Sequence, residues 1–469
     1  MNDGRFAGIP AFEAAALLLV PLVVLGIHWM RSPRTAARGN ALGAAGMLGF
    51  ILVTLAGRGL LADPMVWVGL AVGAGVGIVL ALRVRMIQMP ELVALFNGIG
   101  GAASAVVALL ALRAAVPVPP PAPRVAAFLA TGIGTLTFAG SLIAVFKLAR
   151  WLPSRPVAFR GHATLCLALL GGLLALAGIG AASAGGGAYR VAAAVIPAAG
   201  LLFGVLFMVR VGGADMPVSI SLLNALSGVA AAVAGFAVGN PVPVAVGAMV
   251  GTGGLMLTRI MCRAMNRELG DVLAGRLADA AGAAETPAEA GPSEPARDPA
   301  DLLAAARRVA IVPGYGMALA QAQPAVKRLF DLLEKRGVEV VFAIHPVAGR
   351  MPGHMHILLA EVNLPYERFL ELDEANARLP ETDVALVVGA NDVVNPSAGT
   401  VEGTPISGMP ILRVTEARAV VVCNLDRSPG YAGVPNPLYD APKTTLCLGD
   451  AAQTLSALAD ALAAQPASA

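Results

Sequence analysis

The stretch "AIVPGYGMALAQAQ", residues 310–323, joins an apolar segment to a turn punctuated by glycine. The preceding segment "RRVAIV" (307–312) predicts a buried strand, and residues 317–335 predict a helix. Gly314 and Gly316 match the first two glycines of a dinucleotide-binding fingerprint. The first allows a tight turn, and the second lets the backbone approach a pyrophosphate at a helix N-terminus.

Two parts of that fingerprint are missing. Leu319 stands at the third glycine position, and "IHP" (344–346) rather than an acidic residue ends the next strand. The turn alone therefore fits either a nucleotide site or an ordinary glycine-rich connection. Further strands are predicted at 338–344, 383–390, 419–425 and 444–449, with a final helix at 451–463. Apolar strands that alternate with helices predict a soluble α/β, Rossmann-like domain whose parallel sheet is covered on both faces.

The composition of the whole chain is that of an integral membrane protein. It is 57% hydrophobic and 13% charged, against about 45–50% and about 25% in soluble domains. The net charge of +3 is too small to indicate a nucleic-acid partner. The four cysteines are scattered, so their spacing predicts neither a disulfide framework nor a metal site.

A multi-span helical membrane bundle is predicted before the α/β domain. Nine stretches reach the roughly 20 apolar residues that a spanning helix needs. They are residues 11–30, 41–61, 64–82, 90–112, 125–146, 163–184, 191–209, 217–239 and 243–262. Most are rich in Gly and Ala, which let helix backbones approach closely in lipid. About nine tightly packed transmembrane helices are therefore expected.

The chain divides into three parts. Residues 1–267 are expected to form the transmembrane domain, and residues 268–300, dominated by Ala, Glu, Pro and Gly, a flexible linker. Residues 301–469 are expected to form the soluble domain.

The positions of basic residues predict the orientation of the chain. Thirteen lie in loops on the side of the membrane where the C-terminus is expected: Arg31, Arg34, Arg38, Arg83, Arg85, Lys147, Arg150, Arg155, Arg160, Arg210, Arg259, Arg263 and Arg267. Five lie on the other side: Arg5, Arg58, Arg113, Arg124 and Arg190. The positive-inside rule therefore predicts a cytoplasmic C-terminal domain.

Polar residues follow several of the predicted strands. "IHPVAGRMPGHMHILLAE" (344–361) places Arg350 in a loop beside glycine, where it could meet a phosphate. Its histidines fit either surface positions or a metal cluster that no nearby cysteine or carboxylate completes. "GANDVVNPSA" (389–398) places Gly389, Asn391 and Asp392 directly after a buried strand, where ligands of such sheets bind.

Four motifs together resemble a known family. "PGYGMALAQAQ", "IHPVAGRMPGHMHILLAE", "VGANDVVNP" and "GYAGVPNPLY" are similar to the NADP(H)-binding domain of proton-translocating nicotinamide nucleotide transhydrogenase. The predicted spans, with "MPELVALFNG" (89–98), "GGADMPVSISLLN" (212–224) and "IMCRAMNR" (260–267), resemble the membrane part of its beta subunit. The resemblance covers nearly the whole chain.

This resemblance implies an activity, cofactors and partners. The expected reaction is Si-specific hydride transfer between NAD(H) and NADP(H), coupled to proton translocation across the bacterial inner membrane. NADP(H) would bind to this chain. NAD(H) would bind to an alpha subunit that also carries further membrane helices, in an alpha/beta heterodimer that itself dimerises.

The resemblance also implies roles for individual residues. Gly314, Tyr315, Gly316 and Ala318 would line the nicotinamide and pyrophosphate region, and Arg350 would meet a phosphate. His345 and Asp392 would couple the redox state of the nicotinamide to protonation. The residues expected to form a lid are Gly430, Tyr431, Ala432 and Gly433.

One segment departs from the family pattern. The family carries Lys-Arg-Ser after the fifth strand for the 2′-phosphate, and this chain has "CNLDRSPGYAG" (423–433). Arg427 and Ser428 could still bind that phosphate, whereas Asp426 would repel it. An acid at such a position favours the ribose hydroxyls of NAD. Weakened discrimination between NADP(H) and NAD(H) is therefore a hypothesis.

Polar residues within the spans are candidates for a proton path, because such groups are costly in a membrane. They are Asn97, Ser141 and Asn224, with Asp215 near the cytoplasmic face. The alternative is that they only join helices by hydrogen bonds. A rival reading of the whole chain is a transporter or channel gated by a nucleotide-sensing cytoplasmic domain.

Overall fold

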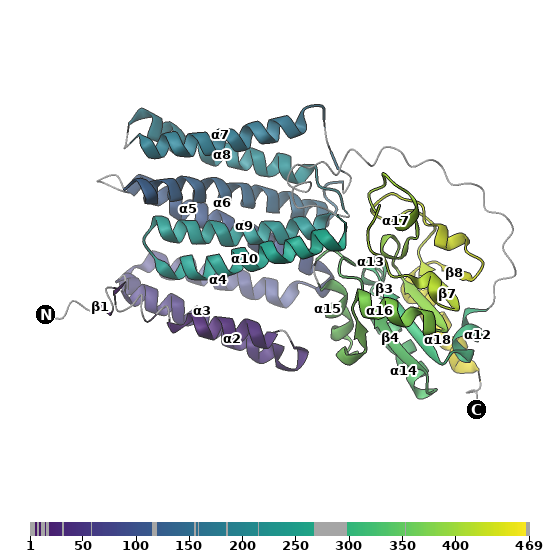
Figure 1. The fold of residues 1–469 in the computed structure, drawn as a ribbon. Helices are drawn as coiled ribbons and strands as arrows, with labels where there is room; N and C mark the ends of the chain where they lie inside the picture. Colours follow the sequence, from purple (N-terminus) through teal and green to yellow (C-terminus); the bar gives the residue numbers. More distant parts are fainter. Residues whose placement is uncertain are drawn as a thin grey trace. The chain divides into compact units, whose positions relative to one another are not determined.

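The computed structural model consists of a helical N-terminal part and a C-terminal α/β domain (Figure 1). It describes residues 5–6, 9–10, 15, 18–30, 32–57, 59–114, 120–153, 156–157, 159–183, 186–213, 215–266, 298–351 and 353–465. The expected linker, 268–300, falls mainly outside these residues. The N-terminal helices are α2 (Val20–Met30), α3 (Pro33–Gly57), α4 (Pro64–Arg83), α5 (Met89–Ala114), α6 (Pro121–Leu148), α7 (His162–Ala182), α8 (Gly187–Val209), α9 (Met216–Ala237) and α10 (Pro241–Ala264).

Eight helices among the described residues, α3 to α10, are long and apolar enough to span a membrane. They correspond to the last eight of the nine predicted stretches. Of the first stretch, 11–30, the described part is the shorter apolar helix α2. The stretch predicted at 41–61 is displaced, because α3 begins at Pro33 and ends at Gly57, before a left-handed Gly59.

Glycines bring neighbouring helices into backbone contact, as the Gly-rich spans predict. A Cβ on Gly134 of α6 would lie 2.4 Å from the carbonyl oxygen of Gly101 on α5, and one on Gly101 would lie 2.8 Å from that of Gly134. A Cβ on Gly247 of α10 would lie 2.6 Å from the carbonyl oxygen of Gly228 on α9. Larger residues at these positions would force the helices apart, so packing depends on the small residues.

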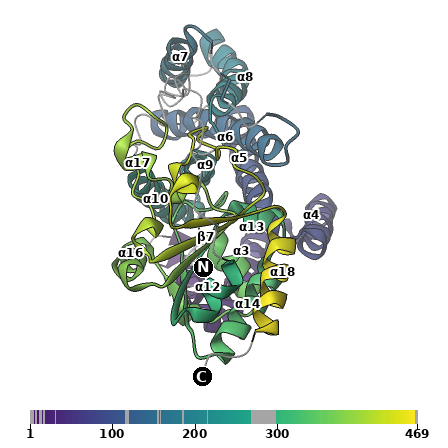
Figure 2. The ribbon, with the colours of Figure 1, turned by 90° about the vertical axis from the view of Figure 1, so that its right-hand side faces the viewer.

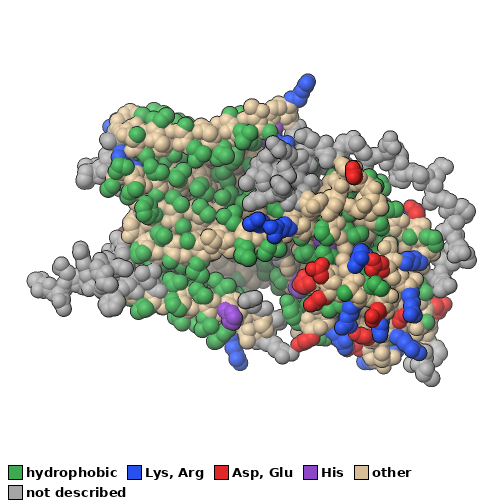
Figure 3. All heavy atoms as spheres, viewed as in Figure 1, with side chains coloured by type: hydrophobic (Ala, Val, Ile, Leu, Met, Phe, Trp, Pro, Cys, Tyr) green, Lys and Arg blue, Asp and Glu red, His purple; other side chains and the backbone are tan. Residues whose placement is uncertain are grey.

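The surfaces of the two parts differ in composition. Hydrophobic side chains cover the visible face of the helices, whereas Lys, Arg, Asp and Glu gather on the α/β domain (Figure 3). Many large apolar side chains of the helices are exposed, including Val72, Ile78 and Leu82 of α4. Such a surface is stable in lipid rather than in water, so the N-terminal part is a membrane domain.

The α/β domain is built on a six-stranded parallel sheet. Its strands are β3 (Arg308–Pro313), β4 (Glu339–Ala343), β5 (Phe369–Leu370), β6 (Val384–Val388), β7 (Ala419–Asn424) and β8 (Thr444–Leu448). A separate two-residue pair, β1 (Arg5–Phe6) and β2 (Ile9–Pro10), is antiparallel. The order β5-β4-β3-β6-β7-β8 is that of dinucleotide-binding sheets, in which the strand order reverses between the first and fourth strands along the chain, here β3 and β6. Five of the six strands were predicted, and the two-residue β5 was missed.

Helices cover both faces of this sheet. Helices α14 (Gln323–Lys335) and α18 (Ala451–Ala464) lie on one side, and α16 (Leu372–Arg378) lies on the other (Figure 2). The shorter helices are α12 (Pro299–Ala305), α13 (Tyr315–Leu319), α15 (His354–Glu361) and α17 (Ser397–Thr400).

The single helix predicted at 317–335 is wrong. The chain forms α13 and α14 instead, with Gln321 between them at a φ of 51°. Pro324 lies in the first turn of α14; inside a continuous helix it could not donate to the carbonyl four residues earlier, and its ring would clash with that carbonyl.

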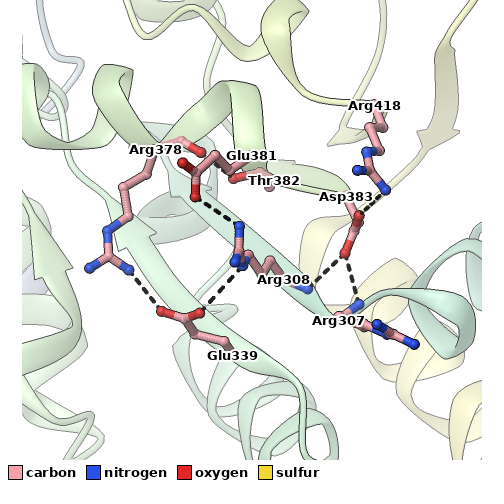
Figure 4. Close-up of polar contacts among 8 residues, drawn as sticks. All are labelled: Arg307, Arg308, Glu339, Arg378, Glu381, Thr382, Asp383 and Arg418. Atoms are coloured by element: carbon pink, nitrogen blue, oxygen red, sulfur yellow. Dashed lines mark hydrogen bonds and ion pairs between the residues drawn. The ribbon is translucent and has the colours of Figure 1, made fainter.

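Charged residues join the amino ends of the strands (Figure 4). Asp383 Oδ2 accepts hydrogen bonds from the backbone N–H groups of Arg307 (2.9 Å) and Arg308 (3.0 Å), while Oδ1 pairs with Arg418. Burial raises the pKa of Asp383, but these N–H donors and the charges of Arg418 and Arg308 outweigh it and hold the pKa below its usual value. Asp383 therefore ties the start of β3 to the start of β6.

We expect Asp383→Ala to destabilise the α/β domain by about 2 kcal/mol, the contribution of a hydrogen-bonded charged acceptor. Because the folded-state pKa is lowered, this contribution is present above the unfolded pKa, about 3.9, and is lost as pH falls through the folded pKa. Hydrogen exchange of β3 and β6 amides in the detergent-solubilised chain measures it. Glu381→Gln is the control, because its pair with Arg308 is exposed and such pairs contribute about 0 to 1 kcal/mol.

Candidate functional site

The turn after β3 packs directly on the loop after β6, at the carboxyl ends of the two central strands. Gly316 N–H donates to the carbonyl oxygen of Gly389 at 2.8 Å, and Gly314 N–H donates to that of Val388 at 2.8 Å. A Cβ on Gly314 would lie 2.3 Å from the Gly389 oxygen, and one on Gly389 would lie 2.1 Å from the backbone nitrogen of Met317. The glycines are thus needed for contact between the two loops.

Two cavities open at this edge of the sheet. The Asp392 cavity is bounded in the α/β domain by Gly314, Tyr315, Gly316, Val347, Ala348, Gly349, Gly389, Ala390, Asn391, Asp392, Val393, Pro405, Ile406, Met409, Pro429, Gly430 and Tyr431. The Asp426 cavity, of about 280 Å³, is bounded by Gly316, Leu319, Ala320, Gly389, Asn391, Cys423, Asn424, Leu425, Asp426, Ser428, Pro429, Gly430, Asp450 and Ala451. The two share the Gly316–Gly389 contact and Pro429–Gly430, so they lie next to each other.

Asp392 is the acidic side chain of the first cavity. Its Oδ2 accepts a hydrogen bond from Ala432 N–H at 3.1 Å, and its buried Oδ1 has no hydrogen-bond partner in the part of the chain that the structure describes. Burial raises the pKa of Asp392 to about 6, although the N–H groups of Ala432 and Tyr431 lower it. A Cβ on Gly430 would lie 2.5 Å from Oδ1. The carboxyl therefore sits within the 430–433 loop and can change its charge near neutral pH.

Arg350 is buried between two tyrosines. Its guanidinium carbon lies 4.5 Å from the ring centre of Tyr315 and 5.5 Å from that of Tyr431, and its Nη2 donates to the Tyr431 hydroxyl at 2.7 Å. Both tyrosines bound the Asp392 cavity. Arg350 thus links the turn after β3 to the 430–433 loop and places a cation behind the cavity wall.

The three histidines of residues 344–361 have separate environments. His345 is buried, its Nε2 donates to the Pro410 carbonyl at 2.7 Å, and its Nδ1 accepts from Val347 N–H at 3.3 Å. Burial lowers its pKa to about 4, against the Pro410 bond and the Glu371 charge. His354 Nδ1 accepts from Arg350 N–H, and His356 pairs with Glu371. No group of three or more His, Cys, Asp or Glu within the described ranges could hold a metal ion.

Three asparagines that the sequence analysis left without a role join the loop after β6 to the end of β7 and the segment that follows it. Asn395 Nδ2 donates to the Pro435 carbonyl at 3.1 Å, and Asn436 Nδ2 donates to Asn391 Oδ1 at 3.0 Å. Asn424 Nδ2 donates to the Ala390 carbonyl and to the Tyr439 hydroxyl. The Asn-Pro pairs at 395–396 and 436–437 are the sequence signal for such turns.

Arg427, in the segment that follows β7, does not bound the Asp426 cavity. Arg427 pairs with Asp440, and Asp426 Oδ1 accepts from Ser428 N–H at 2.8 Å. Asp426 and Asp450 are the charged residues of the Asp426 cavity wall.

Most of the predicted binding residues meet at the two cavities. Those on the cavity walls are Gly314, Tyr315, Gly316, Gly389, Asn391, Asp392, Ser428, Gly430 and Tyr431. Arg350 contacts the wall through the tyrosines, and Ala432 contacts it through Asp392. Ala318, Gly433, Arg427 and His345 do not bound either cavity, and Ala318 and His345 are buried in the domain.

Ser141 lies against the residue that follows Asn97. Asn97 on α5 is buried, and a Cβ on the adjacent Gly98 would lie 3.0 Å from Ser141 Cβ on α6. The buried Ser141 Oγ has no hydrogen-bond partner among the described residues. A Cβ on Gly100 would lie 2.8 Å from Ser227 Oγ on α9, one turn beyond the half-buried Asn224. The buried Asp215 directly precedes α9.

Burial of Asp392 has a measurable effect on stability. Its folded-state pKa of about 6 lies above that of an unfolded aspartate, about 3.9. The stability that its proton contributes is full below about pH 4 and is lost as pH rises through about 6. We therefore expect Asp392→Asn to raise the midpoint of thermal denaturation at about pH 8 and to change it little near pH 4.

The measurement is protease resistance of residues 298–465 in the heated full-length chain. Asp373→Asn, at an exposed position of α16, is the matched control. Equal midpoints for wild type and Asp392→Asn at the higher pH would contradict the buried-charge assignment.

Comparison with known proteins places this site in a family. The family described as NAD(P) transhydrogenase beta subunit matches residues 12–461. A Rhodospirillum rubrum protein named NAD(P) transhydrogenase subunit beta is 40% identical over 460 residues, covering 96% of this chain and 98% of its own length. The protein of that name from a specified strain of this species has the same identity and coverage. The glycine contact, the paired cavities and the apolar helices thus occur in a chain that belongs to the NAD(P) transhydrogenase beta subunit family.

Proposed function

We propose that this chain binds NADP(H) across the Asp392 and Asp426 cavities and exchanges hydride, with Si specificity, with NAD(H) held by an alpha subunit. The exchange is coupled to proton translocation across the bacterial inner membrane. Residues 1–267 form the proton-translocating domain, 268–300 the linker and 301–469 the NADP(H)-binding domain, which lies in the cytoplasm. The bound nicotinamide supplies or accepts the hydride.

The walls of the two cavities fit a dinucleotide. The backbone contacts of Gly314, Gly316 and Gly389 lie at the point where such sheets bind dinucleotides, and all three glycines bound the Asp392 cavity. Asp392 Oδ1 and Asn424 Oδ1 are buried acceptors that have no hydrogen-bond partner among the residues that the structure describes. Unpaired buried acceptors are costly, and hydroxyl or amide donors of a nucleotide would satisfy them. This pair of orphaned oxygens, one at each cavity, is the observation that carries the proposal.

Asp392 is proposed to couple its own protonation to the affinity of the chain for the nucleotide. When ionised, it accepts the Ala432 N–H bond that holds the 430–433 loop over the cavity. Protonation makes it a weaker acceptor and loosens that loop. His345 is proposed to act with Asp392 as the neutral tautomer, holding residues 345–347 against Pro410. Arg350 is proposed to provide the positive charge for a phosphate, and its contacts with Tyr315 and Tyr431 hold it beside the cavity.

A partner must supply the second nicotinamide. Hydride transfer requires two rings within near-attack distance, and the described residues form one nucleotide-binding sheet. One face of helix α4 is an argument for further helices from a partner in the membrane. Gly69, Gly73 and Gly77 recur every fourth residue, and nothing lies within 4 Å of where their Cβ atoms would be. Such a small-residue face is suited to close helix packing. The proposed assembly is a dimer of alpha/beta heterodimers.

The proton path is proposed to run past Asn97, Ser141 and Asn224 toward Asp215. Asn97 and Ser141 lie on the α5–α6 interface, and polar groups at such depth mark ion pathways. Asparagine does not titrate near neutral pH, so the titrating group belongs to a partner helix.

Turnover with the partner tests the proposal. We expect the chain, reconstituted with its alpha subunit in sealed vesicles, to reduce an NAD analogue at the expense of NADPH and to acidify or alkalinise the lumen. Asp392→Asn should lower this rate at least about tenfold, as removal of a positioned acid–base group does, while Asp373→Asn should leave it unchanged. Nucleotide binding without turnover in the wild type would favour the gated-transporter alternative.

Selectivity between NADPH and NADH is expected to be weak. The charged residues of the Asp426 cavity wall are acids, and Arg427 pairs with Asp440. A 2′-phosphate would therefore meet negative charge without a cation in contact. We expect the full-length wild-type chain to bind NADPH and NADH within about tenfold of each other, a difference of about 1.4 kcal/mol.

We expect Asp426→Ser to increase affinity for NADPH, because it removes repulsion of the phosphate, and to lower affinity for NADH, because it removes an acceptor for the ribose hydroxyls. Calorimetry on the detergent-solubilised chain measures both, with Asp373→Asn as the control for loss of surface charge. A wild-type preference for NADPH beyond about a hundredfold would refute this account of the cavity.

A further inference from the structure

Two cysteines lie opposite each other on adjacent strands beside the Asp426 cavity. Cys423 of β7 and Cys447 of β8 are paired in the parallel register, so their side chains share one face of the sheet. Neighbouring strands lie about 4.8 Å apart, which is within the Cα separations of about 4.4 to 6.8 Å that disulfides span. The backbone therefore already brings the two sulfurs within bonding reach.

The two thiols are in contact and chemically unequal. Cys423 donates its S–H to the sulfur of Cys447, which lowers the pKa of Cys447 and raises that of Cys423. Cys447 is half-buried, whereas Cys423 is buried. A partly exposed thiol with a lowered pKa is the one that reacts with oxidants. Cys447 is thus the reactive sulfur, and Cys423 is placed to resolve its oxidised form.

Cys423 is also connected to the nucleotide site. It bounds the Asp426 cavity, and its carbonyl accepts a hydrogen bond from Gly389 N–H at 2.9 Å. Gly389 in turn packs on Gly316. The next residue, Asn424, holds the Ala390 carbonyl. A displacement of Cys423 toward Cys447 therefore moves the backbone that shapes both cavities.

We propose that Cys423 and Cys447 form a reversible disulfide on exposure to peroxide, and that this disulfide weakens dinucleotide binding. The second half of this inference rests on the proposed nucleotide function. The pair thereby acts as a modification site through which oxidants lower the activity of the chain, and thiol reductants restore it.

The chemistry balances with hydrogen peroxide as the oxidant. The Cys447 thiolate takes one oxygen from the peroxide, whose O–O bond breaks, and the hydroxide that leaves is protonated to water. This gives a sulfenic acid at Cys447. Cys423 then attacks that sulfur, the S–O bond breaks, the S–S bond forms, and the leaving hydroxide takes the Cys423 proton as a second water. Two thiols lose two electrons, and the peroxide is reduced to water.

The other two cysteines provide internal references. Cys166 lies in α7 and Cys262 lies in α10, and neither is paired with another cysteine in a strand register. Under conditions that join Cys423 to Cys447, both should remain reduced and be alkylated after denaturation.

The experiment treats the purified full-length chain with hydrogen peroxide, alkylates the remaining thiols and maps the peptides by mass spectrometry. We expect a linked Cys423–Cys447 peptide that disappears with dithiothreitol. Cys423→Ser should instead trap sulfenic acid at Cys447, which dimedone labels. Absence of the linked peptide in the wild type overturns the inference without any variant.

Binding of NADPH to the same samples tests the second half. We expect the oxidised chain to bind at least about fivefold more weakly than the reduced chain, the lower range of coupling between sites, and dithiothreitol to restore affinity. Equal affinity in both forms overturns the regulatory inference. Failure of the reduced chain to bind any nicotinamide nucleotide instead refutes the proposed function, while the peptide map still decides the disulfide.

Discussion

The structure of the site depends on a contact between two backbones. Gly316 and Gly389 approach so closely that neither tolerates a Cβ, and the hydrogen bond between them closes the gap between the β3 and β6 loops. The strand order places these loops at the reversal of the sheet, where a crevice forms at the carboxyl ends. A side chain at either glycine would clash with the backbone of the opposite loop and push the two loops apart.

A second constraint is the burial of Asp392. Burying an ionised carboxyl with one unpartnered oxygen costs folding free energy, and the same burial raises the pKa of Asp392. Hydrogen bonds to charged groups contribute about 1.5 to 3 kcal/mol, and one proton crossing about 150 mV releases about 3.4 kcal/mol. The bond between Asp392 and Ala432 is therefore of the right size for one proton to make or break. A set of several such hydrogen bonds to Asp392 would require more free energy to break than one translocated proton releases.

Much of the fold follows from local pattern, while the site needs tertiary contacts. The apolar runs predict nine spans, of which eight match helices of the described residues that are long enough to cross a membrane, and they predict five of the six strands of the parallel sheet. The two-residue β5 is too short to carry a pattern, and the break at Gln321 depends on Pro324. Glycine spacing located the turn after β3, but the hydrogen bond from Gly316 N–H to Gly389 joins two distant parts of the sequence and required the tertiary structure. The orientation of Arg427 toward Asp440 could not be read from residues thirteen positions apart.

Three chemically different groups converge on the Gly389–Asp392 segment. Asp392 belongs to it and has a pKa raised to about 6, Arg350 stacks on Tyr315 and Tyr431 of the same cavity wall, and the Cys423 carbonyl accepts a hydrogen bond from Gly389 N–H. Because Gly389 has no freedom to move without disturbing Gly314 and Gly316, a change at any of these groups alters the same contact between the two loops. In the proposed function, this glycine contact would let protonation, anion binding and thiol oxidation act on one nucleotide site.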